Sequence, residues 1–135
     1  MIRIRSCLRE DEKAVFALAR DFATSFPVDP ASFSESFPHV LSSSGMCLAV
    51  AQSSDAIIGY VLGTAHPTFY ASGPVAWVEE IMVKECLRKK GVGKLLMEHF
   101  EVWAKSKGCR LVALATRRAA EFYKNLVYTE SAVYF

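Results

Sequence analysis

The sequence predicts one α/β domain over residues 1–135, in which a mixed, mostly antiparallel central sheet is flanked by helices. Apolar stretches with the two-residue period of strands alternate along the chain with stretches that have the period of amphipathic helices. The chain has 135 residues, 52% of them hydrophobic, which is enough for a single core. An order of strand, helix, three strands, helix, strand, helix and strand implies a sheet with helices packed on it.

The first third of the chain combines one clear strand, one clear helix and an irregular segment. Ile2 and Ile4 alternate with arginines, which predicts a strand that ends near Ser6. Residues 21–45 are rich in proline, serine and phenylalanine, so broken helices or a long covering loop are expected there. Asp11 is a good N-cap for the helix in between, whose apolar stripe follows at Val15, Leu18, Ala19 and Phe22.

The rest of the chain alternates strands and helices more regularly. Apolar stretches at 47–52 and 57–64 flank a Ser-Ser-Asp turn and predict a hairpin. A strand is expected at 75–83, followed by a helix from Val92 that Gly108 ends as a C-cap. The remaining expected elements are a short strand at 111–115, a helix at 119–126 and a closing strand at 131–135.

Composition and charge exclude several classes of protein. The chain has 16 Lys+Arg and 14 Asp+Glu, and a net charge of +2 is too small to indicate a nucleic-acid-binding protein. No apolar stretch approaches the ~20 residues that a membrane-spanning helix needs, and no signal-like apolar segment follows Met1. The cysteines are scattered, and no residues have metal-ligand spacing. We therefore expect a cytoplasmic protein with reduced thiols, no metal, and neither a membrane nor a nucleic-acid partner.

The most informative segment is a basic, glycine-bearing loop at 88–93, which reads Arg-Lys-Lys-Gly-Val-Gly and opens a helix. Backbone N–H groups at a helix start lack intrahelical partners and the helix dipole is positive there, so such a loop can cradle a phosphate. Leu96 stands where a dinucleotide-binding motif would have its third glycine, and Gly93-Lys94-Leu95 does not fit a Walker loop. The remaining pattern, Arg-x-x-Gly-x-Gly, is by itself equally typical of a solvated strand-to-helix turn.

A second motif follows that loop at a fixed distance. Residues 119–128 read Ala-Ala-Glu-Phe-Tyr-Lys-Asn-Leu-Val-Tyr. Together with Ile81-Met82-Val83 and the loop at 88–93, this segment resembles the GNAT superfamily of N-acetyltransferases. The acetyl-CoA site of that superfamily consists of such a strand, an Arg/Gln-x-x-Gly-x-Gly/Ala loop, a long helix, and a later helix with Phe-Tyr-x-x-Leu. The resemblance covers residues 75–135 closely and implies the acyl-CoA N-acyltransferase fold.

The resemblance also implies a binding site for acetyl-CoA as co-substrate, at a place where two strands splay apart. The backbone of the strand would bind the pantetheine arm as an added strand would, and the amides of the basic loop would hold the pyrophosphate. Thr116 stands where the family often has an asparagine that contacts the cofactor. The expected cofactor-binding residues are therefore Ile81, Met82, Val83, Arg88, Lys89, Lys90, Gly91, Val92, Gly93, Lys94 and Thr116.

Tyr123 is the catalytic residue that the resemblance implies most directly. It would lie beside the thioester sulfur and protonate the departing thiolate, since a phenol of pKa about 10 is protonated at neutral pH and a thiol leaves with a pKa of about 8.5. Without the resemblance, Tyr123 would be interpreted as a core residue of the last helix.

The acceptor amine needs a base. An alkylamine of pKa about 10.4 is protonated at pH 7, and its deprotonation costs about 4.6 kcal/mol. Glu79 and Glu80 are the candidate bases, and at most one of them faces the acceptor unless a bulge re-aims the strand. The resemblance implies that this strand is often bulged near this point, so alternation does not choose between them. His66, expected in a hairpin loop, and His39 are further candidates.

Alternation alone would place Glu79 on the face of Trp77 and Ile81, and Glu80 on the face of Val78 and Met82. The acceptor would be a small-molecule or peptide amine that enters by the Phe-rich segment 21–41 and the loop 66–73.

Two departures from the family pattern bear on the last helix and its surroundings. Val127 stands where the family usually has a glycine after Leu126, so this helix is expected to end differently. Glu85 stands where a proline is common.

Two other readings of the sequence remain open. One is a non-catalytic CoA-binding or regulatory module on the same fold. The other, against which the net charge of +2 argues, is a basic nucleic-acid-binding domain that would use Arg88, Lys89, Lys90, Arg117 and Arg118. A closing strand that ends at Phe135 could also pair with that of a second copy in a homodimer.

Overall fold

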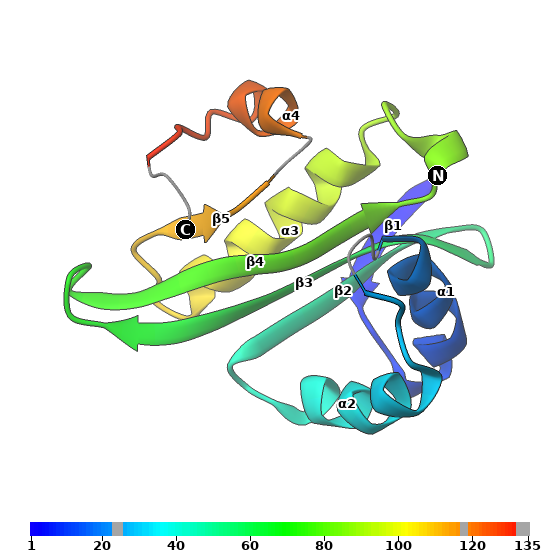
Figure 1. Ribbon diagram of the computed structural model, residues 1–135. Helices are drawn as coiled ribbons and strands as arrows, with labels where there is room; N and C mark the ends of the chain where they lie inside the picture. The colour runs from blue at the N-terminus through cyan, green and yellow to red at the C-terminus, as the bar shows by residue number, and fades with distance from the viewer. Residues whose placement is uncertain (23–25, 117–118, 132–135) are drawn as a thin grey trace.

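The computed structural model describes residues 1–22, 26–116 and 119–131, and its centre is a five-stranded sheet (Figure 1). The strands lie in the order β1-β2-β3-β4-β5. The first three pairings are antiparallel and the pairing of β4 with β5 is parallel, so the expected mixed, mostly antiparallel sheet is confirmed. The strands are β1 (Ile2–Ser6), β2 (Met46–Ser53), β3 (Ala56–Thr68), β4 (Gly73–Val83) and β5 (Val112–Leu114).

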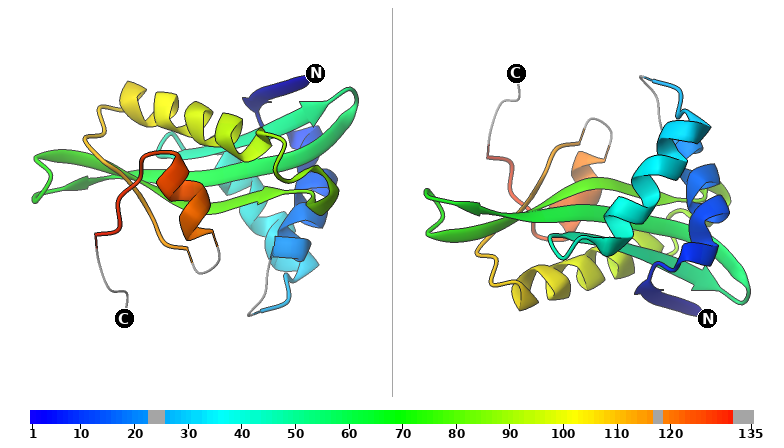
Figure 2. Two further views of the ribbon diagram at one scale, coloured as in Figure 1. Left: turned by 90° about the horizontal axis from the view of Figure 1, so that it is seen from above. Right: turned by 90° about the horizontal axis from the view of Figure 1, so that it is seen from below.

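Helices cover both faces of the sheet and create two separate cores (Figures 1 and 2). One face packs against α3 (Val92–Ser106) and α4 (Ala120–Asn125), and the other against α1 (Glu12–Phe22) and α2 (Pro30–Ser42). The α3 side is centred on Leu96, Met97 and Phe100, all fully buried. A Cβ at Gly63 of β3 would overlap the Phe100 ring, so the glycine allows this close approach of helix and sheet.

The segment from residue 21 to residue 45 contains a helix where the sequence predicts broken helices or a loop. The Asp29 carboxylate caps α2 by accepting a hydrogen bond from the backbone N–H of Ser32 at 2.8 Å, and Pro30 occupies the first helical position. Pro38 lies inside the helix, and Phe37 beside it is buried against the sheet. Tertiary packing of a few phenylalanines therefore outweighs a composition that is poor for helices.

Asp11 does not cap α1 as expected. It lies in the short 3-10 helix Arg9–Asp11, is 6% exposed, and receives two hydrogen bonds from the Arg5 guanidinium, at 2.8 and 3.0 Å. The same carboxylate accepts a third hydrogen bond from the backbone N–H of Leu8. Asp11 thus joins β1 to the turn that precedes α1.

The C-terminal end of α4 differs from the expectation that this helix would end in an unusual way. Val127 adopts the left-handed conformation, with a φ of 70°, although it is β-branched. The N–H of Tyr128 donates to the carbonyl of Tyr123, and the N–H of Val127 donates to that of Lys124. This is the Schellman arrangement that a glycine normally supports, so α4 ends in the usual way despite the substitution.

Within the described ranges, no helix is long and apolar enough to cross a membrane, and no group of side chains could hold a metal ion. All four cysteines are free thiols. The predicted closing strand at 131–135 lies, except for Ser131, outside the described residues.

Candidate active site

The candidate site is built around the part of β4 that has no neighbour on one side. β5 pairs with β4 only at Ala76, Trp77 and Val78. Beyond Val78, β4 continues to Val83 beside β3 alone, while the chain after β5 leads into α4. In the described part of the chain, the β5-side edge of β4 from Glu79 to Val83 is therefore open.

A bulge in β4 lies where the two strands separate. Val78 pairs with Gly63 and Glu80 pairs with Leu62, so Glu79 is an extra residue with no partner on β3. The bulge changes which face each later side chain occupies. Val78 belongs to the core under α3, whereas Met82 belongs to the core under α1 and α2. The prediction from simple alternation, that Val78, Glu80 and Met82 share a face, is therefore wrong.

After the bulge, the peptide groups of Ile81 and Val83 turn toward the open edge. The N–H of Lys84 donates to Ile58 on β3, and the Met82 carbonyl lies against Gly59 of β3. Because neighbouring peptide groups of a strand point in opposite directions, those of Ile81 and Val83 point away from β3. Of the three residues expected to bind pantetheine by their backbone, Ile81 and Val83 thus direct their N–H and C=O groups to the open edge, and Met82 directs its own to β3.

The basic loop continues directly from this edge. A short 3-10 helix, Glu85–Leu87, follows β4, and the Arg88 side chain then turns back so that its Nε donates to the Val83 carbonyl at 3.0 Å. Lys89 and Gly91 both have positive φ, 64° and 84°, and Gly91 is the N-cap residue of α3. A Cβ at Gly91 would meet nothing within 4 Å, so glycine is needed there for its backbone conformation and for the access it gives.

The first turn of α3 also contacts α4. A Cβ at Gly93 would lie 3.0 Å from Cζ of Phe122, so the absence of a side chain lets the Phe122 ring pack on this turn. Phe122 in turn contacts Tyr123 edge-on, with ring centroids 4.9 Å apart. The glycine-bearing loop and the Phe-Tyr helix, distant in the sequence, are thus adjacent in the structure. Lys94 and Lys90 are exposed at the same helix start, and Val92 is buried below it.

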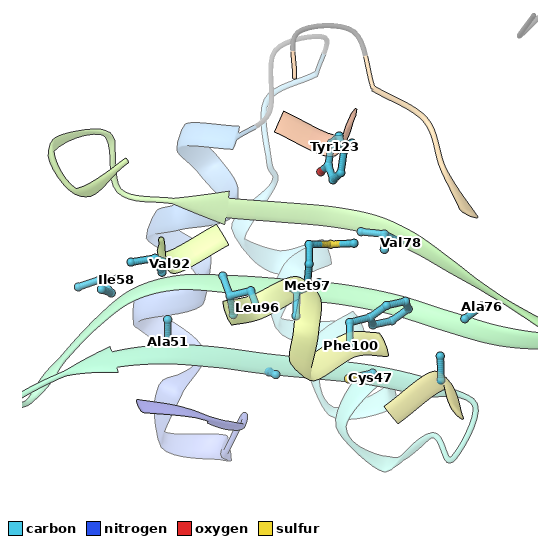
Figure 3. Packing of buried hydrophobic residues seen from close by; sticks show 13 residues of the cluster. Cys47, Ala51, Ile58, Ala76, Val78, Val92, Leu96, Met97, Phe100 and Tyr123 are labelled. Atoms are coloured by element: carbon cyan, nitrogen blue, oxygen red, sulfur yellow. The ribbon is translucent and has the colours of Figure 1, made fainter. Parts of the chain in front are cut away.

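Tyr123 lies between α4 and the sheet, over β4 (Figure 3). Its side chain is 7% exposed, and burial raises the pKa of its phenol above the ordinary value. Tyr123 is therefore a core residue whose phenol is protonated at neutral pH.

Of the two candidate bases, Glu80 is the one with a hydrogen-bond partner among the described residues. Oη of Tyr60, on the neighbouring strand β3, donates a hydrogen bond to Oε1 of Glu80 at 2.7 Å. Tyr60 belongs to the core under α1 and α2, so the Glu80 carboxylate lies on that face of the sheet, whereas Tyr123 lies on the α3 and α4 face. Glu79 is exposed at the bulge. Tyr60 could not be found from the sequence, because its pairing with Glu80 depends on the register that the bulge creates.

The other predicted site residues are placed less directly. The Thr116 hydroxyl accepts a hydrogen bond from the N–H of Ala119 at 3.1 Å, so it supports the start of α4. His66 lies within β3, opposite Val75, and not in a loop as expected. His39 is exposed on α2. Arg117 and Arg118 lie outside the described residues.

The two regions expected to admit the acceptor differ in position. The turn between β3 and β4 stands at the end of a hairpin that extends beyond the helices (Figures 1 and 2). Phe69 and Tyr70 in this turn are strongly exposed. The phenylalanines of α2 instead pack inward: Phe37 is buried, and Phe33 contacts Phe16 of α1 with ring centroids 5.2 Å apart.

The chain is similar in sequence and structure to known proteins. The Acetyltransferase (GNAT) family matches residues 13–126. A transcriptional regulator from Bacillus halodurans C-125 has a TM-score of 0.88 at 23% identity, covering 100% of this chain and 97% of that one. Glucosamine-6-phosphate N-acetyltransferase from Arabidopsis thaliana has a TM-score of 0.88 at 19% identity, covering 100% and 96%. AAC(6')-Iy, solved with a CoA-containing bisubstrate analogue, has a TM-score of 0.83 at 20% identity, covering 100% and 97%.

Proposed function

The chain belongs to the Acetyltransferase (GNAT) family, and from that premise we propose that it is an N-acetyltransferase that moves the acetyl group of acetyl-CoA to a primary amine. The observation that supports this most is the open edge of β4, which leads directly into the basic loop and the N-terminus of α3. The free backbone groups of β4, which could bind the amides of the pantetheine arm, are therefore followed directly by a helix start that could bind the pyrophosphate.

We propose that acetyl-CoA binds along this edge and the basic loop that follows it. The peptide groups of Ile81 and Val83 would hold the pantetheine arm, with Arg88 fixing the end of the strand through the Val83 carbonyl. The amides from Lys89 to Lys94 would hold the pyrophosphate, and the lysines would add charge. Thr116 would contact the cofactor through the proton of its hydroxyl, since the oxygen already accepts from Ala119.

The ammonium nitrogen must lose two protons, one before it attacks and one as the amide forms, and the departing thiolate must gain one. The amine nitrogen attacks the acetyl carbon, the carbon–sulfur bond breaks, and the sulfur leaves as a thiolate. Glu80, on the α1 and α2 face, would accept the proton that the ammonium must lose, with Glu79 as the second candidate. Tyr123, on the opposite face, would give its proton to the thiolate and regain one from the amine as the amide forms. Backbone N–H groups of the open edge would polarise the carbonyl.

The decisive experiment combines binding with turnover. Acetyl-CoA binding only to the folded protein should stabilise it by about 2.7 kcal/mol at a concentration of 100 Kd, which raises the Tm by roughly 10 °C for a domain of this size. Thiol release from acetyl-CoA in the presence of a panel of small-molecule and peptide amines then measures transfer. Binding with no turnover for any amine would indicate the non-catalytic CoA-binding module instead. No Tm shift and no calorimetric binding would contradict both functions.

We further propose that the protein acts in the cytoplasm on a small-molecule or peptide amine. The four free thiols support a reducing compartment, since disulfides would form elsewhere. A homodimer stays a proposal, testable by sedimentation, because the strand that would pair lies outside the described residues.

A further inference from the structure

We infer that Tyr60 is a positioning residue for the acetyl transfer, which acts by fixing the carboxylate of Glu80 next to the bulge in β4. The inference rests on the proposed function, because it assigns Tyr60 a role in the proton transfer proposed for Glu80. It adds a residue outside the two sequence motifs, on a strand that neither motif includes.

Tyr60 is buried, and its hydroxyl donates a hydrogen bond to Glu80. The side chain is 1% exposed and is among the largest fully buried side chains of the protein. Its hydroxyl donates to Oε1 of Glu80 at 2.7 Å, a short distance typical of a charge-assisted bond. Burial and the neighbouring carboxylate both raise the pKa of Tyr60 far above the ordinary value, so the hydroxyl remains a donor at any physiological pH.

The register explains why this contact forms at the bulge. Tyr60 pairs with Met82 and Leu62 pairs with Glu80, so Tyr60 and Glu80 are diagonal neighbours on one face of the β3–β4 ladder. The extra residue, Glu79, follows the last β4 residue that pairs with β5, where the edge opens. Tyr60 therefore holds one carboxylate oxygen of Glu80, the residue that follows the bulge.

The consequence for the reaction is geometric. With Oε1 held by Tyr60, the Glu80 carboxylate cannot rotate freely, and Oε2, which has no hydrogen bond within the described residues, remains for the amine or for a bridging water. A base that must receive a proton in a defined direction gains from such fixation, since small misplacements of reacting groups cost large factors in rate. Loss of the Tyr60 hydroxyl should leave acetyl-CoA binding intact, because the hydroxyl lies in the core on the opposite face from α3.

The test is a double-mutant cycle of Tyr60→Phe and Glu80→Gln, with an amine that the wild type acetylates. Tyr60→Phe should lower kcat roughly 10-fold to 100-fold, with the KM for acetyl-CoA and its calorimetric stoichiometry unchanged. In the Glu80→Gln background, the same substitution should change kcat less than 3-fold, because the group that Tyr60 positions is no longer a base. Rates per acetyl-CoA-binding molecule correct for any unfolded fraction.

Tyr128→Phe is the matched control. It also deletes a hydroxyl that donates to a glutamate, Glu101 of α3, and it keeps the ring that packs against Tyr123. Tyr128→Phe should lower the stability of the protein without lowering kcat. If Tyr60→Phe lowers kcat by the same factor in the wild-type protein and in the Glu80→Gln variant, the inference is overturned and Tyr60 is only a core residue. Unchanged kcat in Tyr60→Phe, or in Glu80→Gln, would overturn it too. A wild type that binds acetyl-CoA and acetylates no amine would instead overturn the proposed function, and this inference with it.

Discussion

Among single residues, Tyr123 is the proposed general acid for the departure of the thiolate. Burial raises the pKa of its phenol, so the proton is present throughout the neutral range. We predict that Tyr123→Phe lowers kcat by about 10²–10⁴-fold, which is about 2.7–5.4 kcal/mol of transition-state stabilisation. Acetyl-CoA affinity, measured by calorimetry, should change little.

The same substitution also separates the catalytic role of Tyr123 from a packing role. The ring contacts of Tyr123 with Phe122 and Tyr128 remain in the phenylalanine variant, so the Tm should be nearly unchanged. A well-folded Tyr123→Phe protein with wild-type kcat would sink the assignment, and the thiolate would then take its proton from water or from the amine.

Some of these site residues could be predicted from the sequence and others could not, for a physical reason. Tyr123 and the residues of the basic loop belong to contiguous motifs, so their spacing can be recognised along the chain. Tyr60 and Glu80 are 20 positions apart and meet through a strand register that contains a bulge. Alternation predicts faces only for an uninterrupted ladder, so it could not choose between Glu79 and Glu80.

At the scale of secondary-structure elements, the start of α3 offers a matched test. Gly91 and Gly108 flank this helix, both have positive φ, and a Cβ at either would meet nothing within 4 Å. We predict that Gly91→Ala and Gly108→Ala each cost about 1 kcal/mol of stability, because alanine is strained in the left-handed region. Only Gly91→Ala should also weaken acetyl-CoA binding in calorimetry. Equal affinities in the two variants would remove Gly91 from the proposed pyrophosphate site.

The end of α4 carries backbone strain that a single change should relieve. Val127 is 90% exposed and adopts a left-handed conformation that costs a non-glycine residue about 1–2 kcal/mol. We predict that Val127→Gly stabilises the protein by about 0.5–1 kcal/mol after the greater unfolded-state freedom of glycine is subtracted. Val102→Gly, at an exposed position inside α3, should instead destabilise it by a few tenths. A lower Tm for Val127→Gly than for the wild type would contradict the claim that the backbone of Val127 is strained.

The helix α2 shows how far element-level prediction reaches. Strands and the helices with clear apolar stripes could be located from periodicity, because each buries one face regularly. The segment 30–42 has an irregular stripe, and only the cap Asp29 and the proline after it indicate a helix start. Its helical state depends on Phe33 and Phe37 packing against α1 and the sheet, which periodicity in the sequence does not show.

For the molecule as a whole, the pair of Arg5 and Asp11 links acid stability to the way the N-terminal strand is held. The Arg5 guanidinium, and then the N–H of Leu8, lower the pKa of Asp11 below the value of about 3.9 that it has in an unfolded chain. A carboxyl whose pKa is lower in the folded state stabilises the fold fully above the unfolded value, and loses this contribution as the pH falls through the folded value.

We therefore predict that the free energy of unfolding falls as the pH drops below about 4, and that Asp11→Asn removes part of this dependence. At pH 7 the variant should lose about 2–3 kcal/mol, since it leaves the guanidinium of Arg5, 19% exposed, without its charged partner. Urea unfolding between pH 2.5 and pH 7 measures both effects. Glu10→Gln, at an exposed carboxylate of the same 3-10 helix, controls for the loss of one negative charge alone. An Asp11→Asn curve parallel to the wild-type curve would show that the acid sensitivity arises from other carboxylates, because the protonation of Asp11 would then not be coupled to folding.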